Sequence, residues 1–241
     1  MRNSAVVWEG RSRLPGRAPI VAIVSGLTRA SMNTKTGRMA QLWILRADQP
    51  PTDAQATGAD AAVCGNCPLR PALGGGCYVV AAQAPQSVWR SWRRGRVPRW
   101  GAAAVAQYAR QRQLPIRLGA YGDPAAVPID VIRTLAQGAP RHTGYTHQWR
   151  TARGRRLQPY CMASVDNGPE ASVAQAQGWR TFRTSWTGPA AGEITCPASE
   201  EAGKRTTCAR CTLCDGAQIL DGRKSIVIRP HGYAVGRMQG D

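Results

Sequence analysis

Short apolar runs, each bounded by polar or turn-forming residues, recur along the chain and predict buried strands. The run at residues 20–27 follows several arginines but ends without a small-residue cleavage pattern. It therefore predicts a strand rather than an export signal. The run at residues 179–185 alternates in the way a half-buried strand does. The predicted strands cover residues 20–27, 39–45, 115–120, 143–147, 160–165 and 179–185.

Helical patterns fill the intervals between these strands. Residues 84–113 predict two helical pieces, because Gly95 and Pro98 interrupt the pattern. The other predicted helices cover residues 52–55, 129–137 and 170–177.

Strands that alternate with helices predict parallel βαβ units. The expected fold class is therefore α/β with a parallel sheet, either open or closed into a partial barrel. A chain of 241 residues with 43% hydrophobic content can bury a full core. We expect residues 20–241 to form a single α/β domain with cysteine-rich metal-binding loops at residues 64–77 and 196–214. Residues 1–19, which contain Arg and Pro, are expected to form a loose arm.

Polar side chains follow three of the predicted strands. Asp123, His147 and Asp166 should meet at the carboxyl edge of a parallel sheet, where functional groups gather. Asp123, Asp166 and the later His231 are candidates for acid–base catalysis. The alternative is a turn or cap role, because Gly-Asp-Pro and Asp-Asn-Gly are both good turn sequences.

The positive charge of the chain is concentrated in its middle. The formal net charge is +18, and residues 61–165 carry fifteen basic and two acidic side chains. The codon bias of a GC-rich genome, which exchanges Lys for Arg, explains why 29 of the 32 basic residues are Arg. It does not explain why residues 61–165 contain so few Asp and Glu. The block predicts binding to a polyanion, with nucleic acid the commonest candidate; the alternative is a merely basic surface.

One segment of that block interleaves aromatic and cationic side chains. Arg neutralises phosphates while Trp stacks on bases, a combination suited to single-stranded or flipped nucleotides. The alternative is that the tryptophans are buried and the arginines are solvated. The candidate nucleic-acid-binding residues are Trp89, Arg90, Trp92, Arg93, Arg94, Arg96 and Arg99.

Eight cysteines in a chain without a convincing export signal favour metal binding in a reducing compartment over a disulfide framework. No stretch approaches the about 18 apolar residues of a membrane span. We therefore expect a cytoplasmic protein with no membrane partner.

The C-terminal cysteines form the most specific motif. Cys208, Cys211 and Cys214 follow one another at spacings of three, and the remote Cys196 is followed by Pro197. Three close cysteines plus one distant cysteine match the ligand set of a ferredoxin-type [4Fe–4S] cluster. Structural zinc, the alternative cofactor, more often uses two separated pairs of ligands.

A second group consists of Cys64, Cys67 and Cys77, the last of them preceded by three glycines. A glycine-rich approach lets the backbone fold closely around a metal. Three cysteines leave a second [4Fe–4S] cluster one ligand short. Cys161 or His231 could fill that position, or it could stay open for a substrate; the alternative is zinc with a fourth protein ligand. On its apolar strand, Cys161 is otherwise expected to be a small buried hydrophobic residue.

Several segments together resemble the phage "gene product 88" family, a group of cysteine-rich proteins without an assigned biochemical role. The resemblance covers residues 30–235 and implies a phage or prophage source, hence the host cytoplasm, and a metal site. It supplies no reaction. The matching segments are Asn33-Thr34-Lys35-Thr36-Gly37, Cys67-Pro68, Cys77-Tyr78, Ile116-Arg117, Gly122-Asp123, Tyr145-Thr146, Ala163-Ser164-Val165-Asp166, Cys196-Pro197, Cys208, Cys211-Thr212-Leu213-Cys214 and His231-Gly232.

Three functions follow as hypotheses. The first is a phage-type iron–sulfur enzyme that acts on nucleic acid or a nucleotide-like substrate. The second is a non-enzymatic nucleic-acid-binding protein whose clusters or zinc ions stabilise the fold. The third is a redox partner that transfers electrons to another enzyme.

Overall fold

The computed structural model describes residues 2–29, 33–232 and 235–237. Met1 and residues 238–241, the ends of the expected arm and of the expected domain, lie outside this range. Within it the strands, in chain order, are β1 (Ser4–Arg11), β2 (Pro19–Ser25), β3 (Ala40–Arg46), β4 (Ile116–Tyr121), β5 (His142–Thr146), β6 (Met162–Val165), β7 (Thr181–Thr184), β8 (Glu193–Thr195) and β9 (Ser225–Ile228).

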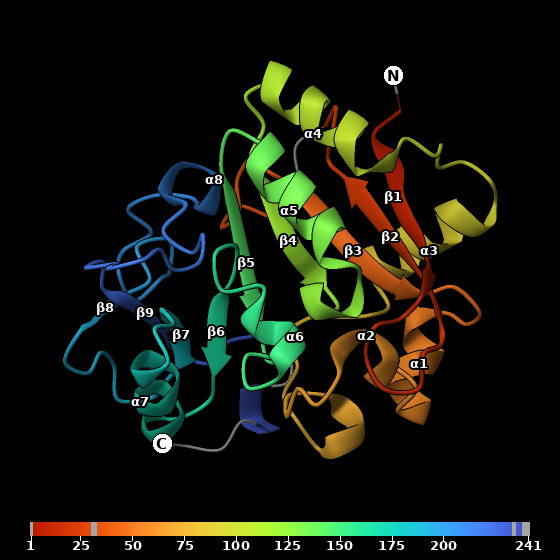
Figure 1. The fold of residues 1–241 in the computed structure, drawn as a ribbon. Helices are drawn as coiled ribbons and strands as arrows, with labels where there is room; N and C mark the ends of the chain where they lie inside the picture. Colours follow the sequence, from red (N-terminus) through yellow and green to blue (C-terminus); the bar gives the residue numbers. More distant parts are fainter. Residues whose placement is uncertain (1, 30–32, 233–234, 238–241) are drawn as a thin grey trace.

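These strands form one open sheet in the order β1-β2-β3-β4-β5-β6-β7-β9-β8 (Figure 1). The pairs β1–β2 and β2–β3 are antiparallel, and every later neighbouring pair is parallel. The predicted α/β class is confirmed, and its parallel sheet extends from β3 to the β8 edge. The edge strands β1 and β8 do not pair, so the sheet does not close into a barrel.

The helices of the described residues are short to medium in length. Short 3-10 turns also occur, η1 (Pro71–Leu73), η2 (Pro124–Ala126) and η3 (Val235–Arg237). The α-helices are α1 (Pro51–Thr57), α2 (Ala61–Cys64), α3 (Ala84–Arg93), α4 (Gly101–Gln111), α5 (Ile129–Gly138), α6 (Ala152–Arg155), α7 (Gly168–Ala176) and α8 (Cys208–Cys211).

The longer helices after β3 cover one face of the parallel strands. Strands β3 to β7 are consecutive in the chain and in the sheet, so right-handed crossovers put their connecting helices on the same face. Helix α4 packs on α5, α5 contacts β4, and α7 contacts β6 and β7 (Figure 1). Ile116 and Leu118 of β4 are fully buried in the core beneath α4 and α5.

Successive side chains of a strand point to opposite faces of the sheet, so the residues next to Ile116 and Leu118 in sequence face away from α4 and α5. Arg117 of β4, Tyr145 of β5 and Phe182 of β7 belong to this second set. The helices do not cover this face, and loops that carry cysteines lie over it instead.

Residues 1–19 differ from the loose arm expected from the sequence. Ser4–Arg11 form β1, whose Val6 accepts a backbone hydrogen bond from Trp100 and donates one to Pro98. Buried apolar side chains of β1 pack against α4, and this tertiary contact outweighs the Arg and Pro content on which the expectation rested. The short strands β8 and β9 near the C-terminus were also not predicted.

No helix among the described residues combines the length and apolar character that crossing a membrane requires.

Candidate functional site

A cavity of about 430 Å³ lies on the sheet face that the helices leave uncovered. This volume falls within the range of small-molecule binding sites. Its walls include inward-facing residues of the parallel strands, among them Arg117, Tyr145 and Phe182. The cavity is also lined by Cys64, Cys67, Cys77, Cys196, Cys208, Cys211 and Cys214.

The first cysteine group lies at the carboxyl ends of β4 and β5. Its loop follows β3 and is fixed by a backbone hydrogen bond of 2.6 Å from Asp123 N to Val63 O. Gln148 Nε2 donates to the carbonyl oxygen of Cys64 at 3.2 Å. Gly65 has a φ of 62°, and a Cβ there would lie 2.4 Å from Gln148 Nε2, so only glycine fits this approach.

The polar residues expected at the carboxyl edge do come together beside this group. Asp123, His147 and Asp166 all line the cavity. The Asp123 carboxylate accepts hydrogen bonds from Ala125 N at 2.9 Å, Thr146 Oγ1 at 2.8 Å and His147 N at 2.9 Å. Burial raises the pKa of Asp123. With its oxygens occupied by these donors, Asp123 holds the β4 and β5 ends together.

His147 lies beside the first cysteine group, although the sequence predicted only its place at the carboxyl edge of the sheet and no role for it. Its Nε2 lies 3.6 Å from Asp166 Oδ1, and its ring interacts with the Cys67 side chain. Burial alone would lower the pKa of His147, but Cys67 and Asp166 raise it well above the usual value. Only its position after a predicted strand pointed to it.

The C-terminal cysteine group is held by contacts to segments far away in sequence. Cys208 N donates to Lys35 O at 2.9 Å, in the segment before β3. Gly144 N of β5 donates to Cys214 O at 2.8 Å. Between them Thr212 adopts a left-handed φ of 49°, which turns the chain back after α8. The loop is thus anchored near the amino ends of β3 and β5.

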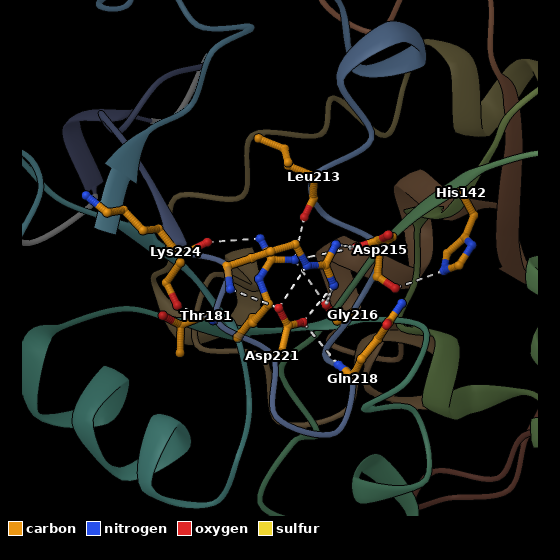
Figure 2. Close-up of polar contacts among 11 residues, drawn as sticks. His142, Thr181, Leu213, Asp215, Gly216, Gln218, Asp221 and Lys224 are labelled. Carbon is orange, nitrogen blue, oxygen red and sulfur yellow. Dashed lines mark hydrogen bonds and ion pairs between the residues drawn. The ribbon is translucent and has the colours of Figure 1, made fainter. Parts of the chain in front are cut away.

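Figure 2 shows a polar network at this loop that includes Leu213, Asp215, Gly216 and Lys224. Arg180, just before β7, donates to all four of these residues. Its guanidinium is 4% exposed and donates to Leu213 O at 2.6 Å, Gly216 O at 3.1 Å and Lys224 O at 2.9 Å. Arg223 Nη1 donates to Asp215 Oδ1 at 2.7 Å in the same network. The residues on both sides of Cys214 are therefore fixed by buried charge-assisted hydrogen bonds.

Two cations, Lys35 and Arg117, lie beside the C-terminal group in the cavity wall. Both interact electrostatically with Cys208, and Arg117 also interacts with Cys214. None of the carboxylate ion pairs in the described part of the chain includes either cation. The sequence names both only within segments of the family resemblance and assigns neither a role, because a single Lys or Arg in a basic chain gives no signal.

Burial raises the pKa of the cavity cysteines at both ends. The pKa values of Cys64 and Cys214 are well above the usual thiol value, and burial is the largest cause for each. A hydrogen bond with Tyr145 lowers the pKa of Cys214 and so offsets part of the effect of burial. Without an electrophilic partner such as a metal, these side chains are neutral thiols at pH 7.

Three buried donor atoms in the cavity walls have no hydrogen-bond partner among the described residues. They are Arg117 Nε, Tyr121 Oη and His147 Nε2. Tyr121 is 4% exposed and interacts electrostatically with Cys64 and Cys77. Each of the three donors therefore belongs to a side chain that interacts with cysteines of one group or the other.

The two residues considered as a fourth ligand for the first group lie elsewhere. Cys161 is fully buried in the main hydrophobic core and is not part of the cavity wall. His231 lines the cavity, but its Nε2 lies 3.4 Å from Lys35 Nζ, close to the C-terminal group. Neither the Cys161 thiol nor the His231 imidazole therefore lies beside Cys67. The side chain of His147 does.

The Trp- and Arg-rich segment lies at the antiparallel side of the sheet, away from the cavity. Trp89 Nε1 donates to Arg46 O at 2.8 Å and Trp92 Nε1 donates to Glu9 Oε1 at 2.9 Å. Both indole rings are half-buried against the core, and the Arg93 guanidinium lies over them. The exposed side chains of the segment are Arg90, Arg93, Arg94, Arg96 and Arg99.

All eight cysteines are free thiols. Within residues 2–29, 33–232 and 235–237, no three or more His, Cys, Asp or Glu side chains form a group that could hold a metal ion. The chain matches no protein-family model, no curated protein and no solved structure. The resemblance to the gene product 88 family therefore stays a prediction.

Proposed function

We propose that this protein is an iron–sulfur enzyme whose two cysteine groups hold metal–sulfur clusters on opposite sides of a shared substrate cavity. Cys196, Cys208, Cys211 and Cys214 would hold one [4Fe–4S] cluster. Cys64, Cys67 and Cys77 would hold a second, with a ligand position that no cysteine fills. A nucleotide-like substrate is the class that the cavity and the charge of the chain favour. The phage-type assignment rests on the sequence resemblance alone.

The observation that carries this proposal is the joint lining of one cavity by seven cysteines and by two buried donors without a partner among the described residues, Arg117 Nε and Tyr121 Oη. Buried polar atoms in folded proteins almost always have a partner. A cluster with thiolate and sulfide acceptors would supply that partner at both ends. Arg117, which interacts electrostatically with Cys208 and Cys214, would donate to the C-terminal cluster, and Tyr121, which interacts with Cys64 and Cys77, would donate to the first. Donors of this kind orient a metal site and tune its potential.

The charges in the cavity support the same proposal. A buried cation needs an anionic counterpart, and neutral thiols do not supply one. Metal-bound thiolates would supply negative charge beside Lys35 and Arg117. Because each cysteine of a [4Fe–4S] cluster binds a different iron, the four thiolates need to surround the cluster rather than meet at one ion.

A bound cluster would supply electron transfer, and an iron without a cysteine ligand would offer an exchangeable position. The chain itself supplies the enclosure. Tyr145 and Phe182, whose ring centroids lie 4.6 Å apart, form an aromatic part of the cavity wall that packs against the C-terminal group. His147 beside Asp166 supplies a proton donor or acceptor next to the first group.

Metal analysis of the anaerobically purified protein tests this proposal. We expect brown protein with broad absorbance near ~400 nm, iron and acid-labile sulfide. Cys208→Ser and Cys64→Ser should each remove one cluster and leave the other. Colourless protein with stoichiometric zinc after anaerobic preparation would contradict the iron–sulfur assignment and favour structural zinc.

A second candidate function is nucleic-acid binding through the exposed arginines of residues 90–99. Five exposed cations project from one short segment, and Trp92 and Trp89 hold it rigidly against the core. Such a surface binds phosphates without reading sequence. This function does not require the cavity, so the two candidates can be tested separately.

A further inference from the structure

Two cations and a histidine converge on one part of the cavity. Lys35 Nζ donates a hydrogen bond of 3.4 Å to His231 Nε2, and Arg117 interacts electrostatically with both residues. All three side chains line the cavity. The like charges of Lys35 and Arg117 repel each other, so this arrangement costs stability unless an anion lies between them.

The acidic residues nearby do not neutralise this group. Glu201 interacts electrostatically with Lys35 and His231, but its Oε1 accepts a hydrogen bond of 2.8 Å from Arg229 N. It is not among the residues that line the cavity. Arg117 Nη2 is bonded to a neutral group, the Tyr78 hydroxyl, at 2.9 Å, and its Nε has no partner among the described residues.

The surroundings of the cationic group are aromatic. The Tyr78 ring lies 5.9 Å from the His231 ring, and Tyr145 packs against Phe182. Planar rings of this kind bind a flat organic group by stacking and by burial of apolar surface. A cavity of about 430 Å³ is large enough for a molecule with one anionic group and one ring system.

We propose that this cavity binds a phosphorylated small molecule of nucleotide type, with its phosphate between Lys35, Arg117 and His231 and its ring system along Tyr78, Tyr145 and Phe182. A phosphomonoester carries a charge of about −1.5 to −2 at pH 7, which matches the two permanent cations. Its tetrahedral oxygens accept hydrogen bonds from several directions, as three separate side chains require. The other end of the bound molecule would face Cys64, Cys67 and Cys77 across the same cavity.

This inference rests on the proposed enzyme function and deepens it. It states that the phosphorylated substrate binds in the cavity rather than at the exposed arginines of residues 90–99. Lys35 and Arg117 also face Cys208, so their role toward a ligand has to be separated from a role toward a cluster. Measurement of binding and of metal content on the same samples makes that separation.

The experiment is calorimetric titration of anaerobically purified protein with nucleoside 5′-monophosphates, the matching nucleosides and inorganic phosphate. At least one monophosphate should bind about 10-fold or more tightly than its nucleoside, and inorganic phosphate should compete with it. Lys35→Met and Arg117→Gln should each weaken monophosphate binding by about 10-fold or more and leave nucleoside binding unchanged. The matched control is Arg112→Gln, which removes one exposed charge at the end of α4 and should have no effect.

Three outcomes would overturn the inference. The first is that no monophosphate binds more tightly than its nucleoside. The second is that Lys35→Met binds as tightly as the control variant. The third is that Lys35→Met loses iron together with binding, which would assign Lys35 to the metal group.

Lys35 is half-buried and makes no ion pair among the described residues, so Lys35→Met is expected to fold. The test can therefore be carried out with this variant even if Arg117→Gln does not fold. Binding without any iron in the protein would contradict the proposed cluster function and leave the phosphate site standing.

Discussion

Arg180 Nη1 donates a hydrogen bond of 2.6 Å to the carbonyl oxygen of Leu213, the residue directly before Cys214. The same guanidinium donates to Gly216 O and Lys224 O, so one buried side chain holds the loop on both sides of this cysteine. The order of the C-terminal cysteine group therefore depends on a residue whose hydrogen bonds go to carbonyl and carboxylate oxygens and to none of the four sulfurs.

We predict that Arg180→Gln lowers the free energy of unfolding by about 2–4 kcal/mol, because several buried carbonyl oxygens lose their donor. Under the proposed function, iron release to a chelator should also become faster for the C-terminal cluster than for the first cluster. Chemical denaturation and timed iron release measure the two effects. Arg110→Gln is the control, since Arg110 also donates to two carbonyl oxygens but on the exposed surface. Equal stability of the two variants would show that the Arg180 network is not what fixes the loop.

Cys161 provides a second prediction. It is fully buried in the hydrophobic core, outside the cavity wall. Cys161→Ala should lower stability by about 1–2 kcal/mol through the lost packing and should leave the metal content of the protein unchanged. Elemental analysis and thermal unfolding of the variant check both parts. Loss of the first cluster in Cys161→Ala would make Cys161 a ligand and would contradict its placement in the core.

The regular part of the fold was predictable because hydrophobic periodicity is a local property. The strand at residues 115–120 and the helix at residues 129–137 correspond closely to β4 and α5. The strand β1 was not predictable, because its burial depends on α4, about a hundred residues away in sequence. The three-residue β8 is too short to show any period.

The candidate site was predictable to the extent that cysteine spacing is specific. The residues that give the cavity its chemistry, Lys35, Arg117, Tyr121 and His147, belong to no motif that assigns them a role. Arg117 and Tyr121 meet in the cavity because alternate positions of β4 face the same side, whereas Lys35 and His147 reach it from the segments before β3 and after β5. The convergence of Asp123, His147 and Asp166 was predictable, because a parallel sheet places strand ends together, but the structural role of Asp123 was not.

Asp221 gives a prediction about pH. Its hydrogen bonds with Arg223 hold the pKa of this carboxyl well below its usual range. A lowered folded-state pKa contributes stability that is fully present above the unfolded pKa of about 4 and is lost as the pH falls toward the folded value. Asp221→Asn should therefore cost about 1 kcal/mol between pH 5 and pH 8, and the difference from the parent should shrink below about pH 4. Urea denaturation across this pH range measures it. A difference that persists unchanged at pH 3 would contradict an ionic origin.

The exposed arginines give a prediction about polyanions. Changing Arg93, Arg94 and Arg96 together to Gln should weaken binding to single-stranded nucleic acid and reduce the salt dependence by a slope of about 2–3, because fewer counterions are released. Electrophoretic or fluorescence titration at several salt concentrations measures this slope. A triple change of Arg153, Arg155 and Arg156 serves as a control of equal charge on another exposed segment. Equal losses from both triple variants would mean that net charge, rather than this segment, attracts the polyanion.

Trp92 should behave differently from its arginine neighbours. Its indole donates to Glu9 and lies against the core, so Trp92→Ala should destabilise the fold by about 2–3 kcal/mol. The salt slope for nucleic-acid binding should stay the same in this variant. A large loss of affinity with no loss of stability would return Trp92 to the role of a base-stacking residue.

The wall of the cavity is assembled from chain segments that are made at very different times during translation. Residues 64–77 leave the ribosome early, whereas residues 196–232, which complete the wall, follow more than a hundred residues later. At about 5–20 residues per second, this interval lasts on the order of ten seconds. During it the first three cysteines lie on an unfinished surface, and the interval ends when the C-terminal loop is docked by Arg180. Under the proposed function, a nascent chain stalled before residue 196 would receive a cluster at the first site only, and the two sites would mature in a fixed order.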